Sequence, residues 1–177
     1  MRAVSLGTGV VAVCWLALAG SGPAGNAGAF NELPLYSAGD RADGLPLVAV
    51  LRRDDTANYV SFVYGDCVPE DDAGCAPPAE IQVWPACRRH LALYDSQASG
   101  GLAAERTSIR GVPAAVFDEG ARLELQTGSS TVVVFADSRG RAARVARALR
   151  AVNGSEPAGS RPLPPPDPGA LEGTLDC

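Results

Sequence analysis

The chain of 177 residues contains no lysine, and all fifteen of its basic residues are arginine. Isoleucine and asparagine are scarce, whereas alanine, glycine and proline are abundant. This composition is expected of a protein from a very G+C-rich genome, so the arginines do not by themselves indicate nucleic-acid binding. The net charge of -5 also has the wrong sign for a phosphate binder. We therefore expect no nucleic-acid partner.

Several signatures of catalytic and metal chemistry are missing as well. The sequence has no Gly-x-Ser-x-Gly turn and no C-x-x-C pair. Its single histidine, His90, leaves a metal site without the usual partners. We therefore expect no enzyme activity, no cofactor and no bound metal. The alternative is a secreted hydrolase in which the fold brings a serine or cysteine to His90.

A long apolar run is absent except near the start of the chain. Residues 10–19 are continuously apolar, Arg2 is the only charge before residue 30, and small residues follow at 17–19 and 27–29. The run is shorter than the about 20 residues that a membrane span needs, and the pattern is typical of a secretory signal peptide. Residues 1–29 are therefore predicted to be a signal peptide, with the mature amino terminus between Gly20 and Phe30. The alternative is a membrane anchor formed by residues 3–19, and in both cases the protein is extracytoplasmic.

Four cysteines follow the leader: Cys67, Cys75, Cys87 and Cys177. An even number in an oxidising compartment predicts two disulfides, and their spacing matches no zinc site. Three pairings are open in principle. If the strands on either side of the first cysteine loop form a hairpin, Cys67 pairs with Cys75 and Cys87 is left for Cys177. On the chain-entropy model the Cys67–Cys75 bond contributes about 2.5 kcal/mol to the stability of the fold, and the Cys87–Cys177 bond about 4.5 kcal/mol.

The rest of the chain divides into a single domain, 30–153, and a proline-rich tail, 154–177, that ends in a cysteine. Glycine, proline and aspartate up to Gly44 predict a loop, and a short helix is expected over 85–94. Strand-like patterns occupy 47–51, 58–64, 80–84, 106–110, 112–117, 122–127 and 131–136.

Two of these strands carry a further prediction. In 122–127 the alternation places Leu123 and Leu125 toward a core and Glu124 and Gln126 toward solvent. The run 131–135 is apolar on both faces and is expected to be a central strand.

The last regular element has the clearest pattern. Asp137 or Ser138 can cap a helix, apolar residues recur at helical spacing from Ala142 to Val152, and Asn153-Gly154 supplies a stop. The sequence therefore predicts an α+β fold, in which an antiparallel sheet of about six to seven strands carries a carboxy-terminal amphipathic helix packed on one face.

Four segments of the chain have a familiar sequence: Leu45-Pro46-Leu47, Val60-Ser61-Phe62-Val63-Tyr64-Gly65-Asp66-Cys67, Gly74-Cys75-Ala76-Pro77-Pro78 and Trp84-Pro85-Ala86-Cys87. Together they resemble small secreted or membrane-anchored actinobacterial proteins of unknown function. A second pattern consists of Arg110-Gly111-Val112-Pro113, Leu123-Glu124-Leu125, Val132-Val133-Val134-Phe135 and the helix through Arg150. It looks like the strand-strand-strand-helix unit of extracytoplasmic bacterial domains of unknown function. The resemblance implies export and this fold, and it supplies no catalytic residue.

Two groups of charged residues are candidate binding sites. The acids of the first cysteine loop are Asp66, Glu70, Asp71 and Asp72. Their order is not that of a calcium-binding loop, so we interpret them as solvated side chains. The arginines on the polar side of the expected helix are Arg141, Arg144, Arg147 and Arg150. They form a candidate partner surface for anionic lipid or an acidic partner.

These observations predict an exported, disulfide-stabilised, non-catalytic binding or interaction module at the cell envelope. Its partner is an unknown protein or another envelope component. The competing hypotheses are the hydrolase built around His90 and an extracytoplasmic sensory domain whose last helix contacts a partner.

Overall fold

The computed structural model describes residues 33–53, 58–69, 74–91, 105–152 and 161–177. The expected leader lies outside these ranges. Within them, no helix has the length and apolar character that crossing a membrane requires.

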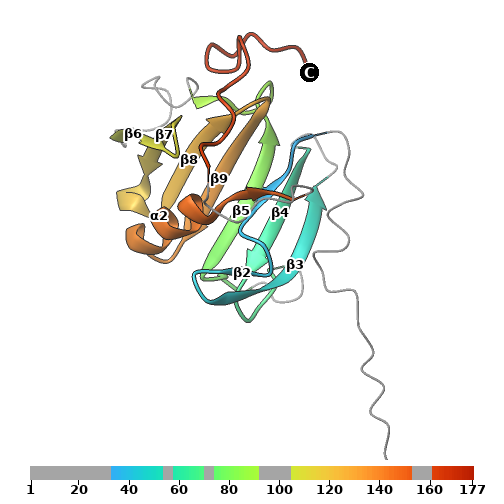
Figure 1. Ribbon diagram of the computed structural model, residues 1–177. Helices are drawn as coiled ribbons and strands as arrows, with labels where there is room; N and C mark the ends of the chain where they lie inside the picture. The colour runs from blue at the N-terminus through green and yellow to red at the C-terminus, as the bar shows by residue number, and fades with distance from the viewer. Residues whose placement is uncertain (1–32, 54–57, 70–73, 92–104, 153–160) are drawn as a thin grey trace, which may run out of the picture.

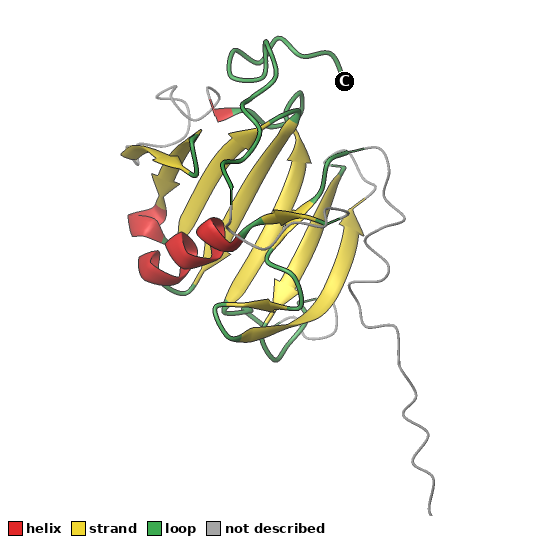
Figure 2. Ribbon diagram, in the orientation of Figure 1, coloured by secondary structure: helices red, strands yellow, loops and turns green. Residues whose placement is uncertain are grey.

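An antiparallel sheet of eight strands forms the body of the protein (Figure 1). Its order is β2 (Arg41–Ala42), β3 (Leu45–Arg53), β4 (Tyr59–Tyr64), β5 (Ala79–Pro85), β9 (Ser130–Ala136), β8 (Arg122–Thr127), β7 (Val112–Phe117) and β6 (Glu105–Ile109). A two-stranded sheet pairs β1 (Tyr36–Ser37) with β10 (Arg150–Ala151). The helix α2 (Arg139–Ala148) packs on one face of the large sheet (Figure 2). The predicted α+β fold is confirmed.

Strand β9 is central, as its apolar run predicts. It lies between β5 and β8, and Val132, Val133 and Val134 are all fully buried. Val132 and Val134 join the core beneath α2, whereas Val133 points to the opposite face, which we call the outer face. The β8–β9 connection is a two-residue turn in which Gly128 has a φ of 52°, a conformation that favours glycine.

Helix α2 begins where the sequence predicts and ends earlier. The Ser138 side chain caps it by accepting from the Arg141 N–H at 3.4 Å. After Ala148 the chain becomes extended, because Arg150 pairs with Ser37 and the Val152 N–H donates to the Leu35 carbonyl at 2.9 Å. The prediction of a helix through Arg150 and Val152 is therefore wrong.

Two further local predictions are wrong. The segment before Gly44 was expected to be a loop but contains β1 and β2, and Leu35 and Tyr36 are buried. Over 85–90 the expected helix is instead a turn in which the Arg88 and Arg89 N–H groups both donate to the Pro85 carbonyl, at 2.9 and 3.1 Å, and Leu91 begins a 3₁₀ turn. Residues 92–94 lie outside the described ranges.

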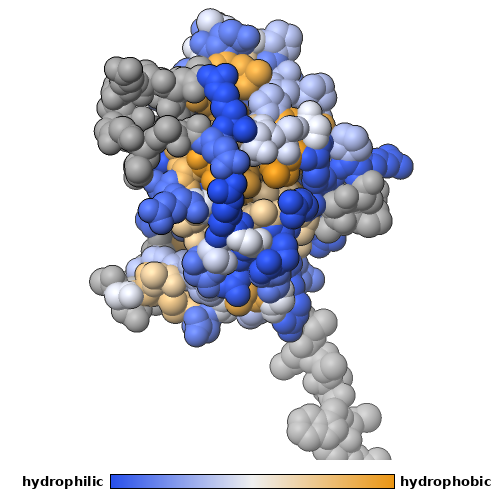
Figure 3. All heavy atoms as spheres, turned by 90° about the vertical axis from the view of Figure 1, so that its left-hand side faces the viewer, coloured by the Kyte–Doolittle hydropathy of each residue, from blue (hydrophilic) through white to orange (hydrophobic). Residues whose placement is uncertain are grey.

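Strand β6 forms one edge of the large sheet. Glu105, Arg106, Thr107 and Ser108 are exposed, and Glu105 pairs with Arg139 of α2 at 2.7 Å. Viewed from the side of β6 and β7, hydrophilic residues cover much of the surface, with hydrophobic residues visible between them (Figure 3). Charged side chains on an edge strand disfavour pairing with other chains. The 3₁₀ helix η3 (Asp118–Gly120) links the neighbouring β7 to β8.

Residues 161–177 form the carboxy-terminal strap, which crosses the end of the sheet at the β6–β7 and β8–β9 turns (Figure 1). The Leu163 N–H donates to the Arg110 carbonyl at 3.0 Å, and the Leu163 side chain enters the core. The Gly128 N–H donates to the Pro165 carbonyl at 3.1 Å, and the Gly128 carbonyl accepts from the Asp167 N–H at 3.0 Å. The proline-rich tail is thus fixed to the domain by main-chain hydrogen bonds.

Candidate functional site

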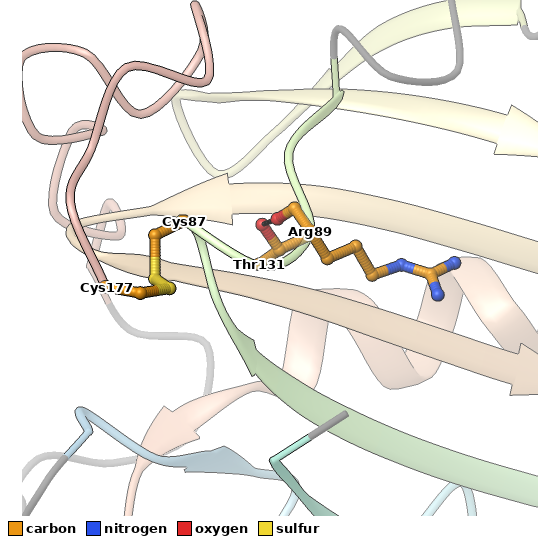
Figure 4. The surroundings of a disulfide bond; sticks show 4 residues. All are labelled: Cys87, Arg89, Thr131 and Cys177. Atoms are coloured by element: carbon orange, nitrogen blue, oxygen red, sulfur yellow. Dashed lines mark hydrogen bonds between the residues drawn. A yellow bond between two sulfur atoms is a disulfide. The ribbon is translucent and has the colours of Figure 1, made fainter. Parts of the chain in front are cut away.

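Both disulfides are present in the expected pairing. Cys67–Cys75 closes the loop between β4 and β5 with Cα atoms 6.0 Å apart. Cys87–Cys177 joins the turn after β5 to the end of the strap with Cα atoms 5.4 Å apart (Figure 4). Disulfides form and persist in oxidising compartments, so this framework is compatible with an extracellular protein.

A carboxylate is buried on the outer face of β8. Glu124 is 0% exposed. Its two carboxylate oxygens accept hydrogen bonds from two nitrogens of the Arg89 guanidinium, Nη2 to Oε1 at 2.5 Å and Nε to Oε2 at 3.2 Å. The Arg122 Nε lies 3.3 Å from Oε1 of the same carboxylate. An ionised carboxylate needs such partners when it leaves water. Arg89 therefore connects the turn after β5 to β8 by a charge-assisted fork.

The expectation that Glu124 and Gln126 face solvent is wrong, since Gln126 is also 0% exposed. The Gln126 side chain accepts from the Leu91 N–H at 3.3 Å and donates to the Ala170 carbonyl at 3.0 Å. The Thr131 hydroxyl donates to the Arg89 carbonyl (Figure 4). The turn after β5 and the strap therefore cover this part of the outer face through hydrogen bonds.

Three half-buried side chains form an aromatic row on the outer face: Tyr59, Trp84 and Arg89. The Tyr59 and Trp84 rings are stacked with centroids 4.1 Å apart and planes at 18°. The Arg89 guanidinium carbon lies 5.0 Å from the centroid of the Trp84 ring, which is cation–π geometry. The apolar positions of β4 and β5 alternate with these residues, so Val60 and Val83 enter the core while the aromatic rings point outward.

A hydrogen-bonded chain beside the row fixes the Trp84 ring. The Trp84 indole N–H donates to Gln82 at 3.1 Å, and the Gln82 amide donates to Glu80 at 2.9 Å. The Ser61 hydroxyl donates to the same Glu80 oxygen at 2.5 Å. The strand patterns alone did not indicate this row. The available signal was that Tyr59 and Trp84 alternate with the core residues of their strands, such as Val60 and Val83.

His90 follows Arg89 and lies under the strap. A methyl group built on Gly173 would collide with the His90 Nε2 atom, so the strap closes that edge of the imidazole. The His90 Nδ1 atom is buried and has no hydrogen-bond partner among the residues that the structure describes. In the part of the chain that the structure describes, no group of three or more His, Cys, Asp or Glu side chains is placed to hold a metal ion. Asp66 of the acidic loop is exposed; Glu70, Asp71 and Asp72 lie outside the described residues.

Two of the four candidate arginines bind one carboxylate. Arg144 donates to Asp43 through Nε at 2.6 Å and Nη2 at 2.9 Å, and Arg141 donates through Nε at 3.1 Å. Hydrogen bonds from Arg144 and then Arg141 lower the pKa of Asp43 from 3.8 to about 2. Arg147 is exposed on α2, whereas Arg150 lies in β10 and not on the helix. Whether these arginines contact a partner stays a prediction.

Comparison of the chain with models of protein families, with curated proteins and with solved structures found no match. The resemblance to exported actinobacterial proteins therefore stays a prediction.

Proposed function

We propose that the protein is an exported, non-catalytic binding module of the cell envelope, and that the aromatic row contacts its partner. The observation that carries this proposal is the position of Trp84. It is the only tryptophan after the expected leader, and it lies half-buried on the outer face of β5 instead of in the core. Tryptophan, tyrosine and arginine are the residues most enriched at the centres of protein interfaces.

The geometry of the row favours binding for a second reason. Tyr59 and Arg89 pack on the Trp84 ring, and its indole N–H is held by Gln82. Side chains that are already ordered lose little conformational entropy when a partner arrives. Tyr59 and Trp84 lie on hydrogen-bonded strands, and the Arg89 N–H donates to the Pro85 carbonyl, so the backbone of the row is ordered as well.

Export is supported by the two disulfides and by the predicted signal peptide. Terminal sequencing of protein from the native cells tests it. We expect the first residue to lie between Gly20 and Phe30. An intact Met1 in the membrane fraction would instead support the anchor.

The surroundings of His90 and Glu124 support the non-catalytic part of the proposal. Gly173 closes the Nε2 edge of His90, and two arginines hold Glu124. A general base or acid must instead reach the proton that it transfers. A panel of ester, peptide and glycoside substrates should show no turnover above background. Turnover that the His90→Ala variant abolishes would establish the hydrolase and overturn this proposal.

The binding surface is tested by co-sedimentation of the purified mature protein with envelopes isolated from the native cells. We expect Trp84→Ala and Tyr59→Ala to weaken binding by about tenfold or more, as for central interface residues. Arg147→Ala is the matched control, because Arg147 is exposed on α2 at the opposite face. Circular dichroism should show that all three variants are folded. Loss of binding in Arg147→Ala alone would place the contact on the helix, as the sensory-domain hypothesis requires.

A further inference from the structure

The carboxy-terminal strap covers polar groups of the domain over most of its length. The Thr127 hydroxyl donates to the Pro164 carbonyl at 2.8 Å, and the Gln126 amide donates to the Ala170 carbonyl at 3.0 Å. Gly173 lies against His90. Beyond Leu163, which belongs to the core, Ala170 is the one buried residue of the strap.

Because these contacts are mainly polar, residues 164–177 can separate from the sheet. If they lift away, the Gln126 amide and the Thr127 hydroxyl exchange a protein acceptor for water. The apolar residues that these fourteen positions withdraw from solvent are Ala170 and, in part, Pro166, Leu171 and Leu175. The net free energy of such an exchange is small compared with that of opening an apolar core. Polar contacts of this kind are typical of interfaces that form and separate reversibly.

The covalent attachment of this part of the strap is Cys87–Cys177. Cys177 is exposed, and Cys87 is half-buried. Exposed disulfides are the ones that external thiols reach, and they include the regulatory ones. Cys67–Cys75 differs, because it closes a short loop between β4 and β5. Hydrogen bonds between these two strands already hold the ends of that loop together.

We propose that Cys87–Cys177 is a thiol-operated latch on the strap. With the bond intact, the strap covers Gln126 and His90. With the bond reduced, residues 164–177 leave the sheet and expose both side chains while the sheet stays folded. This inference does not depend on what the aromatic row binds.

The reductant that the latch requires is a dithiol, supplied by a protein or by a small molecule. One of its thiolates attacks Sγ of Cys177 and forms a mixed disulfide, and Cys87 leaves as a thiolate. The second thiol then attacks the mixed disulfide and releases Cys177. Two electrons pass to the protein, which ends as two thiols, and the dithiol is oxidised to a disulfide.

Hydrogen exchange of the mature full-length chain, before and after treatment with dithiothreitol, tests the latch. The Gly128 N–H donates to Pro165 and the Asp167 N–H donates to Gly128, so both amides report whether the strap is down. We expect both to exchange at least tenfold faster after reduction. The Leu163 amide, which donates to Arg110, and the amides of β4 and β5 should remain much better protected than these two, although losing the cross-links lowers the stability of the whole domain.

Two double variants separate the disulfides. Cys67→Ser/Cys75→Ser retains only the latch and should respond to dithiothreitol like the natural chain. Cys87→Ser/Cys177→Ser should show fast Gly128 and Asp167 exchange without any reductant. The proposal is overturned if these two amides stay protected when the latch is absent, because the bond would then be a redundant staple. It is also overturned if β4 and β5 lose as much protection as Gly128 and Asp167, because the bond would then stabilise the whole fold and not the strap in particular.

Discussion

The two faces of the large sheet are covered through different kinds of interaction, and the alternating side chains of strand β8 take part in both. On the helix side, Leu123 and Leu125 join the apolar core beneath α2. On the outer side, Glu124 and Gln126 are buried beneath Arg89 and the strap, to which they are joined by an ion pair and a hydrogen bond. Apolar packing is non-directional, so neighbours can adjust to a change. A buried charge depends on particular partners, so the outer face should be the less tolerant of substitution.

The strongest test of this difference is Glu124→Ala. Removal of the carboxylate leaves Arg89 and Arg122 as partly buried charges around an empty position, and breaking a buried ion pair costs about 3–5 kcal/mol. Urea unfolding followed by circular dichroism measures this loss. Glu124→Gln keeps the shape and a hydrogen-bond acceptor, so it should lose less. A cost below about 1 kcal/mol for Glu124→Ala, as at exposed pairs, would show that the ion pair does not close the outer face.

The neighbouring substitution Leu125→Ala tests the helix side. Leu125 is fully buried in the core, and deleting a leucine side chain there costs about 3 kcal/mol. Leu125→Met, which nearly conserves volume, should cost less than about 1.5 kcal/mol. The same urea titration serves both variants. If Leu125→Ala is markedly more destabilising than Glu124→Ala, the order of tolerance that we infer for the two faces is reversed.

A polar group within the helix-side core gives a smaller effect. Tyr64 is fully buried there, and its hydroxyl accepts from the Ala38 N–H and donates to the Gly39 carbonyl, both at 3.1 Å. Tyr64→Phe leaves both backbone groups without this partner and should cost about 2 kcal/mol in thermal or urea unfolding. An unchanged stability would mean that water replaces the hydroxyl.

The same tyrosine predicts a loss of stability at alkaline pH. Burial raises the pKa of Tyr64 from 10.0 to about 12. The neutral phenol is therefore favoured in the folded protein. Its contribution to the free energy of unfolding is complete below pH 10 and is lost as the pH rises toward 12. The difference in stability between the natural chain and Tyr64→Phe should shrink over that interval. A constant difference would contradict the assignment.

The smallest effect is expected at the surface, where Asp43 joins the β2–β3 turn to α2. Because the pKa of Asp43 is lowered from 3.8 to about 2, its contribution is present above pH 4 and is lost as the pH falls toward 2. Asp43→Asn should flatten the dependence of the melting temperature on pH in that interval and leave the alkaline side unchanged. Added salt should reduce the difference, since exposed ion pairs are screened.

Elements that depend on local pattern were predictable from the sequence. The central strand β9, the Gly128-Ser129 turn and the Ser138 cap follow from nearby residues. The burial of Glu124 and Gln126 does not, because their cover comes from Arg89 and Ala170, far away in the chain. The end of α2 also depends on a distant segment, since Arg150 leaves the helix to pair with Ser37. Most of the candidate site could therefore not be predicted from the sequence. The exception is the outward direction of Tyr59 and Trp84, which follows from their alternation with core residues of their strands.

The order of the strands has a consequence for how the chain folds. Strand β9 completes the hydrogen bonding of β5, although β6, β7 and β8 lie between them in the sequence. A nascent chain that has not yet supplied β9 presents the unpaired edge of β5, with the apolar residues Ile81 and Val83, to other molecules. Unpaired apolar edges recruit strands from neighbouring chains. Chains that stop before residue 130 should therefore accumulate in aggregates rather than as a folded half of the protein.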